Sequence, residues 1–279
     1  MRPQVRVVHA RGWTKPEPPG CSVDSGWLGV FDVFRSYNSQ FVTLEVHYRR
    51  LERSCAALEI SGLAALEEIR AELCGTGITP DVRVRITVAS SIALGAYGTW
   101  IELEPLEVQS EWSSGIALAI VRAERVTRSG HKMASFGAHR TALSSARALG
   151  AAEALIRDHD DAIREGATSN IFVVKGDQVI TPDGDGIFPG FMRRRVLRWL
   201  SRESVPVEFR PLYSEDFGEH DFGEHTEAFI TSSVRGVVPV RAMADRTFET
   251  GPMTLGHRLR ADIESSLESG VDRFLPDGK

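Results

Sequence analysis

The strict alternation of residues 82–88 constrains the fold of this chain more than any other feature of its sequence. Valine and isoleucine occupy the even positions of this segment, and arginine and threonine occupy the odd positions. Successive side chains of a β-strand point to opposite faces, so the pattern predicts a strand with one buried face and one polar face. Residues 44–58 follow a helical period instead, with apolar side chains at steps of four and three. The chain must therefore combine strands and helices.

Further segments extend this α+β prediction along the chain. Period-two and turn signals predict strands at 30–37, 98–103, 117–126 and 227–231, and a hairpin at 170–180. Helical periods predict helices at 63–74, 138–149, 192–202 and 255–268. Residues 1–25 are rich in proline and glycine, so we expect an irregular arm there. The organisation that follows is two domains, residues 1–118 and residues 119–279.

Composition excludes several classes of protein. The chain is 42% hydrophobic and carries a net charge of −5, so nothing in it suggests a nucleic-acid-binding surface. No apolar run approaches the roughly 20 residues that span a bilayer, and the first 20 residues lack the apolar core of a secretory signal. The three cysteines have no metal-type spacing and are typical of reduced thiols. We therefore expect a cytoplasmic protein that binds neither nucleic acid nor membrane.

Lysine is scarce in this chain. Only Lys15, Lys132, Lys175 and Lys279 are present among 33 basic residues. An arginine cannot act as an amine nucleophile, whereas a buried lysine can, so amine chemistry is restricted to four positions. Lys15 lies in a Pro-rich segment, Lys175 in a predicted turn, and Lys279 at the last position. Lys132, between two structured segments, is therefore the candidate for amine chemistry.

Four separated segments carry candidate functional residues. They are His-x-x-Arg-Leu-x-x-Ser at 47–54, Gly-His-Lys at 130–132, Glu-Gly-x-x-x-Asn at 165–170, and Gly-Phe-Met-Arg at 190–193 after Thr-Pro at 181–182. Each segment alone has an ordinary structural explanation, such as a polar helix edge, a solvated charge or a turn. A glycine-led helix start also exposes backbone N–H groups, which is a good site for an anion.

Taken in order, and followed by Thr-Ser-Ser and Pro-Val near 231–240, these segments resemble the class IV (fold type IV) aminotransferases. The resemblance implies pyridoxal 5′-phosphate (PLP) as cofactor, with Lys132 as the lysine that forms the Schiff base. It implies that Glu165 pairs with the pyridine nitrogen and that Arg50 contacts the phosphate. A small α/β domain, a larger pseudo-barrel domain with PLP between them, and a homodimer that completes the site are also implied.

The same resemblance assigns further cofactor-binding positions. Asn170 closes the Glu-Gly-x-x-x-Asn motif and is grouped with the cofactor-binding residues. Phe191 and Met192 match helix-start positions whose backbone N–H groups bind the phosphate. Ser233, with Ser232 beside it, matches a hydroxyl site for the phosphate at which threonine is more usual. No metal is implied, and two histidines in a repeat at 216–225 are more simply explained as part of a solvated loop.

The family's reaction implies two substrates, an amino acid and a 2-oxo acid, between which an amino group moves. Lys132, once its amine is released and neutral, would transfer the proton from the substrate Cα. Glu165 would keep the pyridine nitrogen protonated, so that the ring accepts electrons from that carbon.

The substrate's carboxylate needs a cation, and the sequence is less informative on this point. The Arg-x-His pair usual in D-amino-acid members is missing from residues 90–98, and Phe31 stands where tyrosine is common. Arg35 shares a predicted strand face with Phe31, and Arg85 lies on the strand leading into that loop. This pair resembles a less typical group of D-amino-acid transaminases, although surface salt bridges would also explain both arginines.

Two alternatives stay open at this point. A branched-chain L-amino-acid aminotransferase often has arginine in the first strand, but its usual tyrosines and Gly-Met-Gly-type loop are not found. An aminodeoxychorismate lyase uses the same scaffold and cofactor without transferring nitrogen. A PLP-binding protein without catalysis is the weakest alternative, because the lysine and glutamate positions are both filled.

Overall fold

The computed structural model describes residues 4–21, 25–74, 81–123, 130–134, 137–184, 187–217, 226–244 and 246–270. The chain forms two compact units, Met1–Glu107 with His131–Phe136, and Val108–Gly130 with Gly137–Lys279. The sequence places the boundary between residues 118 and 119 and assigns Lys132 to the second domain. In the structure the boundary falls after Glu107, and residues 131–136 belong to the first unit because the segment around Lys132 pairs with a strand of that unit.

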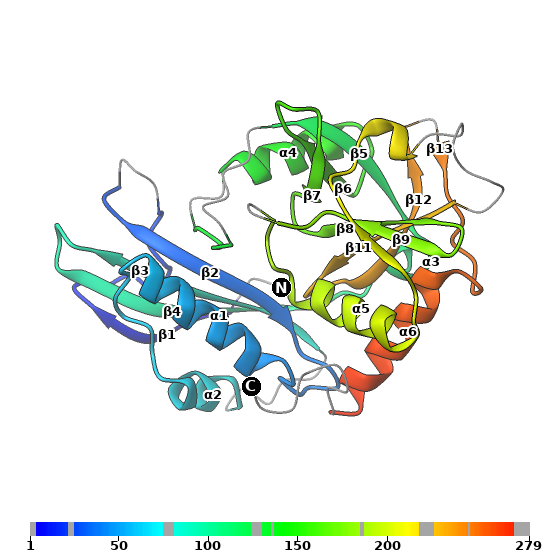
Figure 1. Ribbon diagram of the computed structural model, residues 1–279. Coiled ribbons are helices and arrows are strands. Elements are labelled where there is room, and N and C mark those ends of the chain that lie inside the picture. The colour runs from blue at the N-terminus through cyan, green and yellow to red at the C-terminus, as the bar shows by residue number, and fades with distance from the viewer. Residues whose placement is uncertain are drawn as a thin grey trace. The chain divides into compact units, whose positions relative to one another are not determined.

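The first unit is an antiparallel sheet with two helices (Figure 1). Its strand order is β1-β4-β3-β2, and each neighbouring pair is antiparallel. The strands are β1 (Gln4–Arg11), β2 (Leu28–Arg35), β3 (Val82–Ser91) and β4 (Ala96–Pro105), and the helices are α1 (Leu44–Ala57) and α2 (Leu66–Cys74). The predicted alternating strand and the predicted helix at 44–58 are thus confirmed.

The alternation in β3 builds the core of the first unit. Val84, Ile86 and Val88 are fully buried in one cluster with apolar residues of β2 and of α1. Each buried side chain of this size contributes roughly 1.5–3 kcal/mol to folding. The opposite face of β3 carries Arg83, Arg85 and Thr87. The helices therefore cover the apolar side of the sheet and not this polar side.

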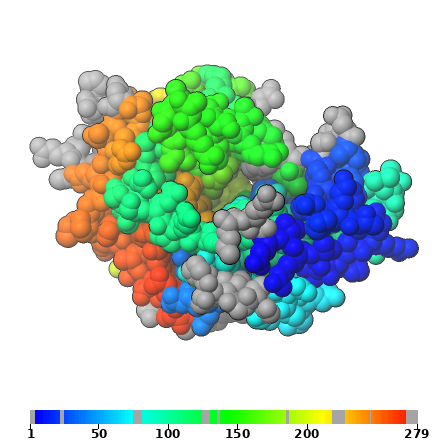
Figure 2. Space-filling model, turned by 180° about the vertical axis from the view of Figure 1, so that it is seen from behind, coloured from blue at the N-terminus to red at the C-terminus, as the bar shows by residue number. Residues whose placement is uncertain are grey.

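The prediction of an irregular arm is wrong for residues 4–11. These residues form β1, which pairs with β4 from Gln4 opposite Leu103 to Arg11 opposite Tyr97. The strand lies at the edge of the sheet, and its residues are exposed or half-buried, as Figure 2 shows for the dark blue surface of this unit. Its apolar residues therefore do not form a buried stripe, and its partner lies about 90 residues away in the chain, so no local signal reveals it.

The second unit contains a larger mixed sheet with the order β10-β9-β8-β11-β12-β5-β6-β7, in which β13 pairs with β12. The pairs β12–β5, β5–β6 and β10–β9 are parallel, and the others are antiparallel. The strands are β5 (Ile116–Arg122), β6 (Glu153–Arg157), β7 (Ile163–Gly166), β8 (Asn170–Lys175), β9 (Gln178–Thr181), β10 (Val207–Phe209), β11 (Thr226–Ser232), β12 (Gly236–Met243) and β13 (Arg246–Thr247).

The two ends of this sheet meet. Ile163 of β7, the last strand in the order, forms a bridge with Leu212, three residues beyond the end of β10, the first strand. The Ile163 N–H donates to the Leu212 carbonyl at 2.6 Å, and the Leu212 N–H donates back at 3.1 Å. A sheet whose edges pair in this way is curled into a barrel-like form. The predicted α+β class, with a pseudo-barrel in the larger unit, is confirmed.

Helices of the second unit surround this sheet (Figure 1). They are α3 (Glu111–Ser114), α4 (Gly137–Ala148), α5 (Phe191–Arg202) and α6 (Leu255–Glu268), with a 3₁₀ turn η1 (Ser214–Phe217). Helix α6 has the bounds that the sequence predicts. It begins where the Thr254 hydroxyl accepts from the His257 N–H and where the Glu227 carboxylate accepts from Leu255 and Gly256.

Two properties of the described residues bear on function. None of their helices combines the length and the apolar character that crossing a membrane requires. Within the same ranges, no group of three or more His, Cys, Asp and Glu side chains is placed to hold a metal ion. The two histidines of the repeat, His220 and His225, lie outside the described residues.

Candidate active site

Lys132 lies on an extension of the sheet of the first unit. The Phe31 N–H donates to the Lys132 carbonyl at 2.9 Å, and the Ala134 N–H donates to the Gly29 carbonyl at 2.8 Å. The bridge between Val30 and Met133 completes a short antiparallel pairing with β2. In such a pairing Lys132 stands opposite Phe31, and the two side chains share one face. The backbone of the lysine is thus fixed by β2 rather than left in a mobile loop.

Phe31 lies beneath two cations. The Lys132 Nζ is 5.7 Å from the centroid of its ring, and the Arg85 Cζ is 3.9 Å from the same centroid. Arg85 also pairs with Glu102 of β4 at 3.2 Å and donates from Nε to the Thr87 hydroxyl at 3.3 Å. Its side chain keeps 27% of its surface exposed. The structure therefore brings together three predicted site residues, Lys132, Phe31 and Arg85, on one face of the sheet.

Arg35 is placed differently. Its Nη2 pairs with the Asp81 carboxylate at 3.3 Å, its Nε donates to the Ser36 carbonyl, and its guanidinium stacks on Tyr37 at 4.6 Å. Asp81 also accepts from the Ser36 hydroxyl and the Ser39 N–H. Four residues of strand, about 13 Å, separate Arg35 from Phe31. These contacts fix the end of β2, and the structure does not bring Arg35 next to Lys132 along this strand.

Arg50 belongs to a buried polar cluster between α1 and β2. Its Nε and Nη2 donate to the two carboxylate oxygens of Asp32 at 2.6 and 2.5 Å. The His47 Nδ1 lies 3.1 Å from both Asp32 Oδ1 and Arg50 Nη2. All three side chains are at least nine-tenths buried. A two-point Arg–carboxylate contact fixes the orientation of the guanidinium, so Asp32 sets the direction in which Arg50 presents its remaining donors.

The charges of this cluster are strongly perturbed. Burial lowers the pKa of His47 to about 4, although the nearby Asp32 carboxylate acts in the opposite direction. Burial also raises the pKa of Asp32, but the Arg50 guanidinium and the contact with His47 more than offset this and hold that pKa well below its usual range. At neutral pH the cluster therefore contains a carboxylate, a guanidinium and a neutral imidazole.

In the second unit, Glu165 and Asn170 bind the backbone of the same residue, Phe188. The Glu165 Oε2 accepts from the Phe188 N–H at 3.0 Å, and the Asn170 Nδ2 donates to the Phe188 carbonyl, also at 3.0 Å. Glu165 on β7 is 3% exposed, and Asn170 at the start of β8 is 4% exposed. The predicted carboxylate is thus buried and anchored through one oxygen. Asn170 fixes the turn at 187–190 that leads into α5.

The predicted phosphate-binding helix start is present. Helix α5 begins at Phe191, and its N-cap residue Gly190 has no side chain to accept the first N–H groups. The first turn of an α-helix leaves its N–H groups without intrahelical acceptors, and the helix dipole adds positive potential there. Phe191 and Met192 are both 1% exposed, so their side chains pack in the core while their backbone forms the turn. This end of α5 is suited to an anion.

Ser232 and Ser233 lie at the turn that follows β11. Ser232 ends the strand, and its hydroxyl accepts from the Arg235 N–H at 3.1 Å. Both serines are half-buried. The neighbouring Thr231 hydroxyl is buried and has no hydrogen-bond partner among the described residues. A buried hydroxyl in this condition is unusual in a protein and is a candidate ligand-binding group.

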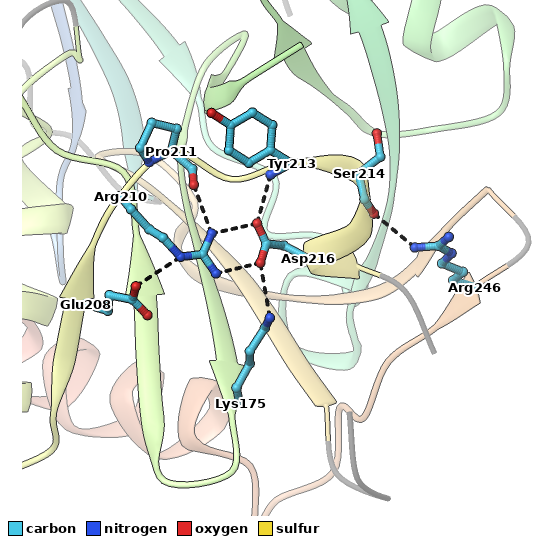
Figure 3. Close-up of polar contacts among 8 residues, drawn as sticks. All are labelled: Lys175, Glu208, Arg210, Pro211, Tyr213, Ser214, Asp216 and Arg246. Carbon is cyan, nitrogen blue, oxygen red and sulfur yellow. Dashed lines mark hydrogen bonds and ion pairs between the residues drawn. The ribbon is translucent and has the colours of Figure 1, made fainter. Parts of the chain in front are cut away.

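Of the other lysines, Lys175 is held in an ion-pair network. Its Nζ lies 3.1 Å from Asp216 Oδ1, and Arg210 donates to both oxygens of the same carboxylate (Figure 3). These ion pairs give Lys175 a structural role at the end of β8. Lys15 stacks on Trp13 at 5.7 Å in an exposed segment. Lys279 lies outside the described residues.

Sequence reasoning missed several residues that support this site. His131 contacts the Ser54 hydroxyl at 2.9 Å and so ties the lysine segment to α1. Glu102 forms an ion pair with the predicted site residue Arg85. Glu153 forms an ion pair with Arg235, which lies near Ser232 and Ser233 in the sequence. His47 and Ser54 could have been identified from the sequence. They lie three residues before and four residues after Arg50 in the motif at 47–54, which places them on the same side of a helix. Nothing local marks Phe188, because its role depends on its backbone.

The groups present fit PLP. The cofactor needs an amine for its aldehyde, a carboxylate for its ring nitrogen and donors for its phosphate. The first unit contains an amine at Lys132 and a guanidinium at Arg50, and the second unit contains the buried carboxylate of Glu165 and the start of α5, so groups of each kind are present. The close approach at Gly190 is in keeping with this, because a Cβ there would lie 2.1 Å from Asn170 Oδ1. Only glycine fits between the asparagine and the helix start.

Comparison with known proteins finds relatives that are named as aminotransferases. Over 231 residues the chain is 27% identical to a probable branched-chain-amino-acid aminotransferase of Thermotoga maritima, covering 81% of this chain and 82% of that protein. A D-alanine aminotransferase of Bacillus licheniformis is 24% identical over 255 residues (86% and 88% covered). An aminodeoxychorismate lyase of Bacillus subtilis is 27% identical over 247 residues (77% and 78%). Two branched-chain-amino-acid aminotransferase-like proteins of Arabidopsis thaliana are 26% and 27% identical, but the chain spans less than half of their length.

Solved structures share the fold. An aminotransferase from Brucella abortus bound to PLP has a TM-score of 0.70 at 26% identity, with 84% of this chain and 86% of that chain covered. The fold IV transaminase CpuTA1 from Curtobacterium pusillum has a TM-score of 0.71 at 23% identity, with 88% of each chain covered. The family described as amino-transferase class IV matches residues 29–243. As its ordered motifs predict, the chain belongs to the class IV aminotransferase family of PLP-dependent enzymes.

Proposed function

We propose that this protein is a PLP-dependent transaminase that moves an amino group between a D-amino acid and a 2-oxo acid. The observation that carries the proposal is the arrangement on β2, where Lys132 and Arg85 both lie over the ring of Phe31. An amine for covalent attachment of the cofactor and a cation for a substrate carboxylate are thus present on one face of one sheet.

The residues have distinct chemical roles in this proposal. When bound, the cofactor supplies an electron sink for the electrons of the substrate Cα–H bond. The Lys132 Nζ would hold the cofactor through its amine and, as a neutral amine, would take the proton from the substrate Cα. The Glu165 carboxylate would pair with the ring nitrogen of the cofactor, and its buried position would strengthen that interaction.

The phosphate contacts are proposed for both units. In the first unit Arg50, oriented by Asp32, contributes a permanent positive charge. In the second unit the N–H groups at the start of α5 and the hydroxyls of Ser232 and Ser233 donate hydrogen bonds. Asn170 supports these groups by fixing the Phe188 peptide that precedes α5.

The contacts of the two arginines support Arg85 over Arg35 as the residue that binds the substrate carboxylate. Both guanidiniums pair with a carboxylate, Arg35 with Asp81 and Arg85 with Glu102, but Arg35 is 7% exposed whereas Arg85 is 27% exposed and lies over Phe31. A guanidinium that retains exposed surface beside the amine is the better partner for a carboxylate. The D-alanine aminotransferase among the similar proteins is in keeping with a D-amino acid as substrate.

Two other functions of the same scaffold have support of their own. The similarity to a probable branched-chain-amino-acid aminotransferase supports an L-amino-acid substrate. The similarity to an aminodeoxychorismate lyase supports a reaction that releases pyruvate without nitrogen transfer. These alternatives share Lys132 and Glu165 with the proposal and differ in the substrate that is bound.

Covalent attachment is tested by borohydride reduction of the PLP-loaded protein, followed by peptide mapping. The label is expected on Lys132, and a Lys132→Ala variant should take up no reducible cofactor. Lys175→Ala is the matched control, because it removes an amine that is bound to Asp216. A label on Lys175, or a protein that takes up no PLP, would contradict the proposal.

Substrate class is tested with single-turnover reactions. The PLP-loaded protein is mixed separately with D-alanine, D-glutamate, L-leucine and L-isoleucine, and the loss of the absorbance of the lysine-bound cofactor is followed. We expect rapid loss with the D-amino acids alone. Loss with L-leucine or L-isoleucine instead would favour the branched-chain function, and pyruvate release from aminodeoxychorismate without any amino-acid reaction would favour the lyase.

The assembly and the location of the protein are also proposals. The family resemblance implies a homodimer, which light scattering combined with size-exclusion chromatography tests directly. A cytoplasmic location is supported by the cysteines, because Cys21, Cys55 and Cys74 are all free thiols. Fractionation of the source cells tests that location.

A further inference from the structure

A fully buried carboxylate lies behind the candidate cofactor-binding loops of the second unit. Glu153, the first residue of β6, has no exposed surface. Burying a carboxylate is costly unless it is paired and hydrogen-bonded. Its Oε2 pairs with the Arg235 Nη2 and accepts from the hydroxyls of Thr168 and Ser169, and its Oε1 accepts from the Ala154 N–H.

The partners of Glu153 belong to two separate segments. Thr168 and Ser169 lie in the short connection between Glu165 and Asn170. Arg235 lies in the turn between β11 and β12, two residues after Ser233. One carboxylate therefore contacts two of the three segments of this unit that carry proposed cofactor-binding residues, and the third is the start of α5.

Further contacts fix each segment in place. The Arg235 Nη2 also donates to the Thr168 hydroxyl at 2.8 Å, which joins the two segments directly. The Arg235 N–H donates to the Ser232 hydroxyl at 3.1 Å, and its carbonyl accepts from Arg260 of α6 at 3.1 Å. In the other segment, the Gly166 N–H donates to the Ser169 carbonyl at 2.7 Å. A Cβ on Gly166 would lie 2.4 Å from the Ser169 hydroxyl, so this connection is tightly packed.

We infer that Glu153 and Arg235 are positioning residues for the cofactor site. They fix the 166–169 connection and the 232–236 turn relative to each other, and thereby set the positions of the Glu165 carboxylate and of the Ser232 and Ser233 hydroxyls. This inference rests on the proposed function, which assigns those three residues to PLP. Neither Glu153 nor Arg235 is assigned a contact with the cofactor.

The inference is tested by measuring PLP binding rather than turnover. Apo-protein is titrated with PLP for the wild type, Glu153→Gln, Arg235→Gln and the double variant, and the melting temperature of each apo-protein is measured in parallel. Each single change is expected to raise the Kd for PLP about 10- to 100-fold, the range found when residues that orient metal ligands are removed. The double variant should lose less affinity than the two single changes multiplied, because both act through one contact.

Two further variants complete the design. Thr168→Val removes the hydroxyl that joins Glu153 and Arg235 and leaves the ion pair in place, so it is informative if a charge-removing variant does not fold. It should raise the Kd for PLP several-fold. Arg122→Gln is the control, because Arg122 pairs with Asp161 at an exposed site of the same unit. It should leave the Kd unchanged.

The outcomes separate the inference from the proposed function. Weaker PLP binding with sub-multiplicative loss in the double variant supports positioning. A lower melting temperature with PLP affinity within twofold of the wild type would show a purely structural role and overturn the inference. A wild-type protein that does not bind PLP would instead contradict the proposed function, and the inference would fall with it.

Discussion

At the scale of single residues, the buried group Asp32, His47 and Arg50 places a carboxylate, a neutral imidazole and a guanidinium in direct contact. The proposed phosphate contact of Arg50 requires a fixed direction of the guanidinium, and Asp32 fixes that direction through two oxygens. His47 contacts the same carboxylate while remaining neutral, because burial disfavours its charged form. Removing a partner from such a group leaves a buried charge unpaired and typically costs about 3–5 kcal/mol.

His47 makes the stability of the protein depend on pH. Its pKa falls from 6.5 to about 4 on folding, so between these values the unfolded state binds the proton more readily. The stabilisation is complete above pH 6.5 and is lost as the pH falls toward 4. It amounts to about 2 kcal/mol between pH 7 and pH 5. In His47→Gln this part of the pH dependence should disappear, as measured by urea unfolding of the apo-protein at several pH values.

The exposed His159 supplies the control for this experiment. His159→Gln should retain the pH dependence of the wild type, because that side chain remains in water on folding. An unchanged pH profile in His47→Gln would show that another group causes the acid sensitivity.

Arg85 gives a prediction for the reaction itself. Arg85→Ala should raise the KM for a D-amino acid about 10- to 100-fold, since a charge-assisted hydrogen bond contributes roughly 1.5–3 kcal/mol. PLP uptake should be retained. Arg83→Ala is the matched control, because Arg83 lies two residues from Arg85 on the same strand and the same face. Arg83 pairs with Glu104 of β4. Equal effects of the two substitutions on KM would contradict the assignment of the carboxylate to Arg85.

The predictability of the site differs from residue to residue. Lys132, Glu165 and Arg50 could be identified as candidates because side-chain chemistry and motif order mark them in the sequence. Glu153 could not, because its importance comes from contacts with residues 15 and 82 positions away. The sequence predicts both Arg35 and Arg85 as candidates for the substrate carboxylate, and the contacts with Asp81 and Phe31 distinguish them.

At the scale of elements, the start of α5 depends on Gly190. A Cβ at this position would lie 2.1 Å from Asn170 Oδ1, far inside van der Waals contact. In Gly190→Ala the asparagine must move, and its hydrogen bond to the Phe188 carbonyl is lost. The variant should be less stable by about 1–3 kcal/mol and should bind PLP more weakly. Thermal melting and PLP titration of the apo-protein measure the two effects.

Gly137→Ala serves as its control. Gly137 is the first residue of α4, and a Cβ there meets no atom within 4 Å. Alanine should be neutral or stabilise that helix by up to about 1 kcal/mol. Similar losses in both glycine variants would indicate that the close contact with Asn170 does not determine the start of α5.

Elements that bury a continuous stripe were predictable, and edge elements were not. Helix α6 was predicted with its observed bounds because its helical period is a local signal. Strand β1 was missed because half of its residues face solvent and its partner β4 is distant in the chain. The strands β6, β7 and β12 were missed for a different reason. They are buried inside a mixed sheet, so their sequences lack the strict alternation that marks a half-buried strand.

At the scale of the whole molecule, closure of the large sheet could not be derived from the sequence. It requires that the chain after β10 reach β7, and the bridge between Ile163 and Leu212 is a backbone contact without a side-chain signature. The segment that makes this bridge is short, and the Leu212 side chain within it is fully buried. Its position depends on the ion-pair network around Asp216, which joins Arg210, just before the bridge, to Lys175 at the end of β8 (Figure 3).

Asp216→Asn should therefore weaken the closure of the sheet. The carboxylate is buried, and although burial raises its pKa, its hydrogen bonds with Arg210, the Tyr213 N–H and Lys175 lower that pKa to about 2. A depressed pKa means that the stabilisation is present above pH 4 and is lost as the pH falls toward 2. At pH 7 the variant should be less stable by about 2 kcal/mol, and the difference from the wild type should shrink below pH 4. Glu215→Gln, at the adjacent exposed position, should show neither effect.

Hydrogen exchange gives the local readout, because the Ile163 and Leu212 amides should exchange faster in Asp216→Asn at neutral pH. Unchanged protection of these two amides would show that the sheet closes without the network.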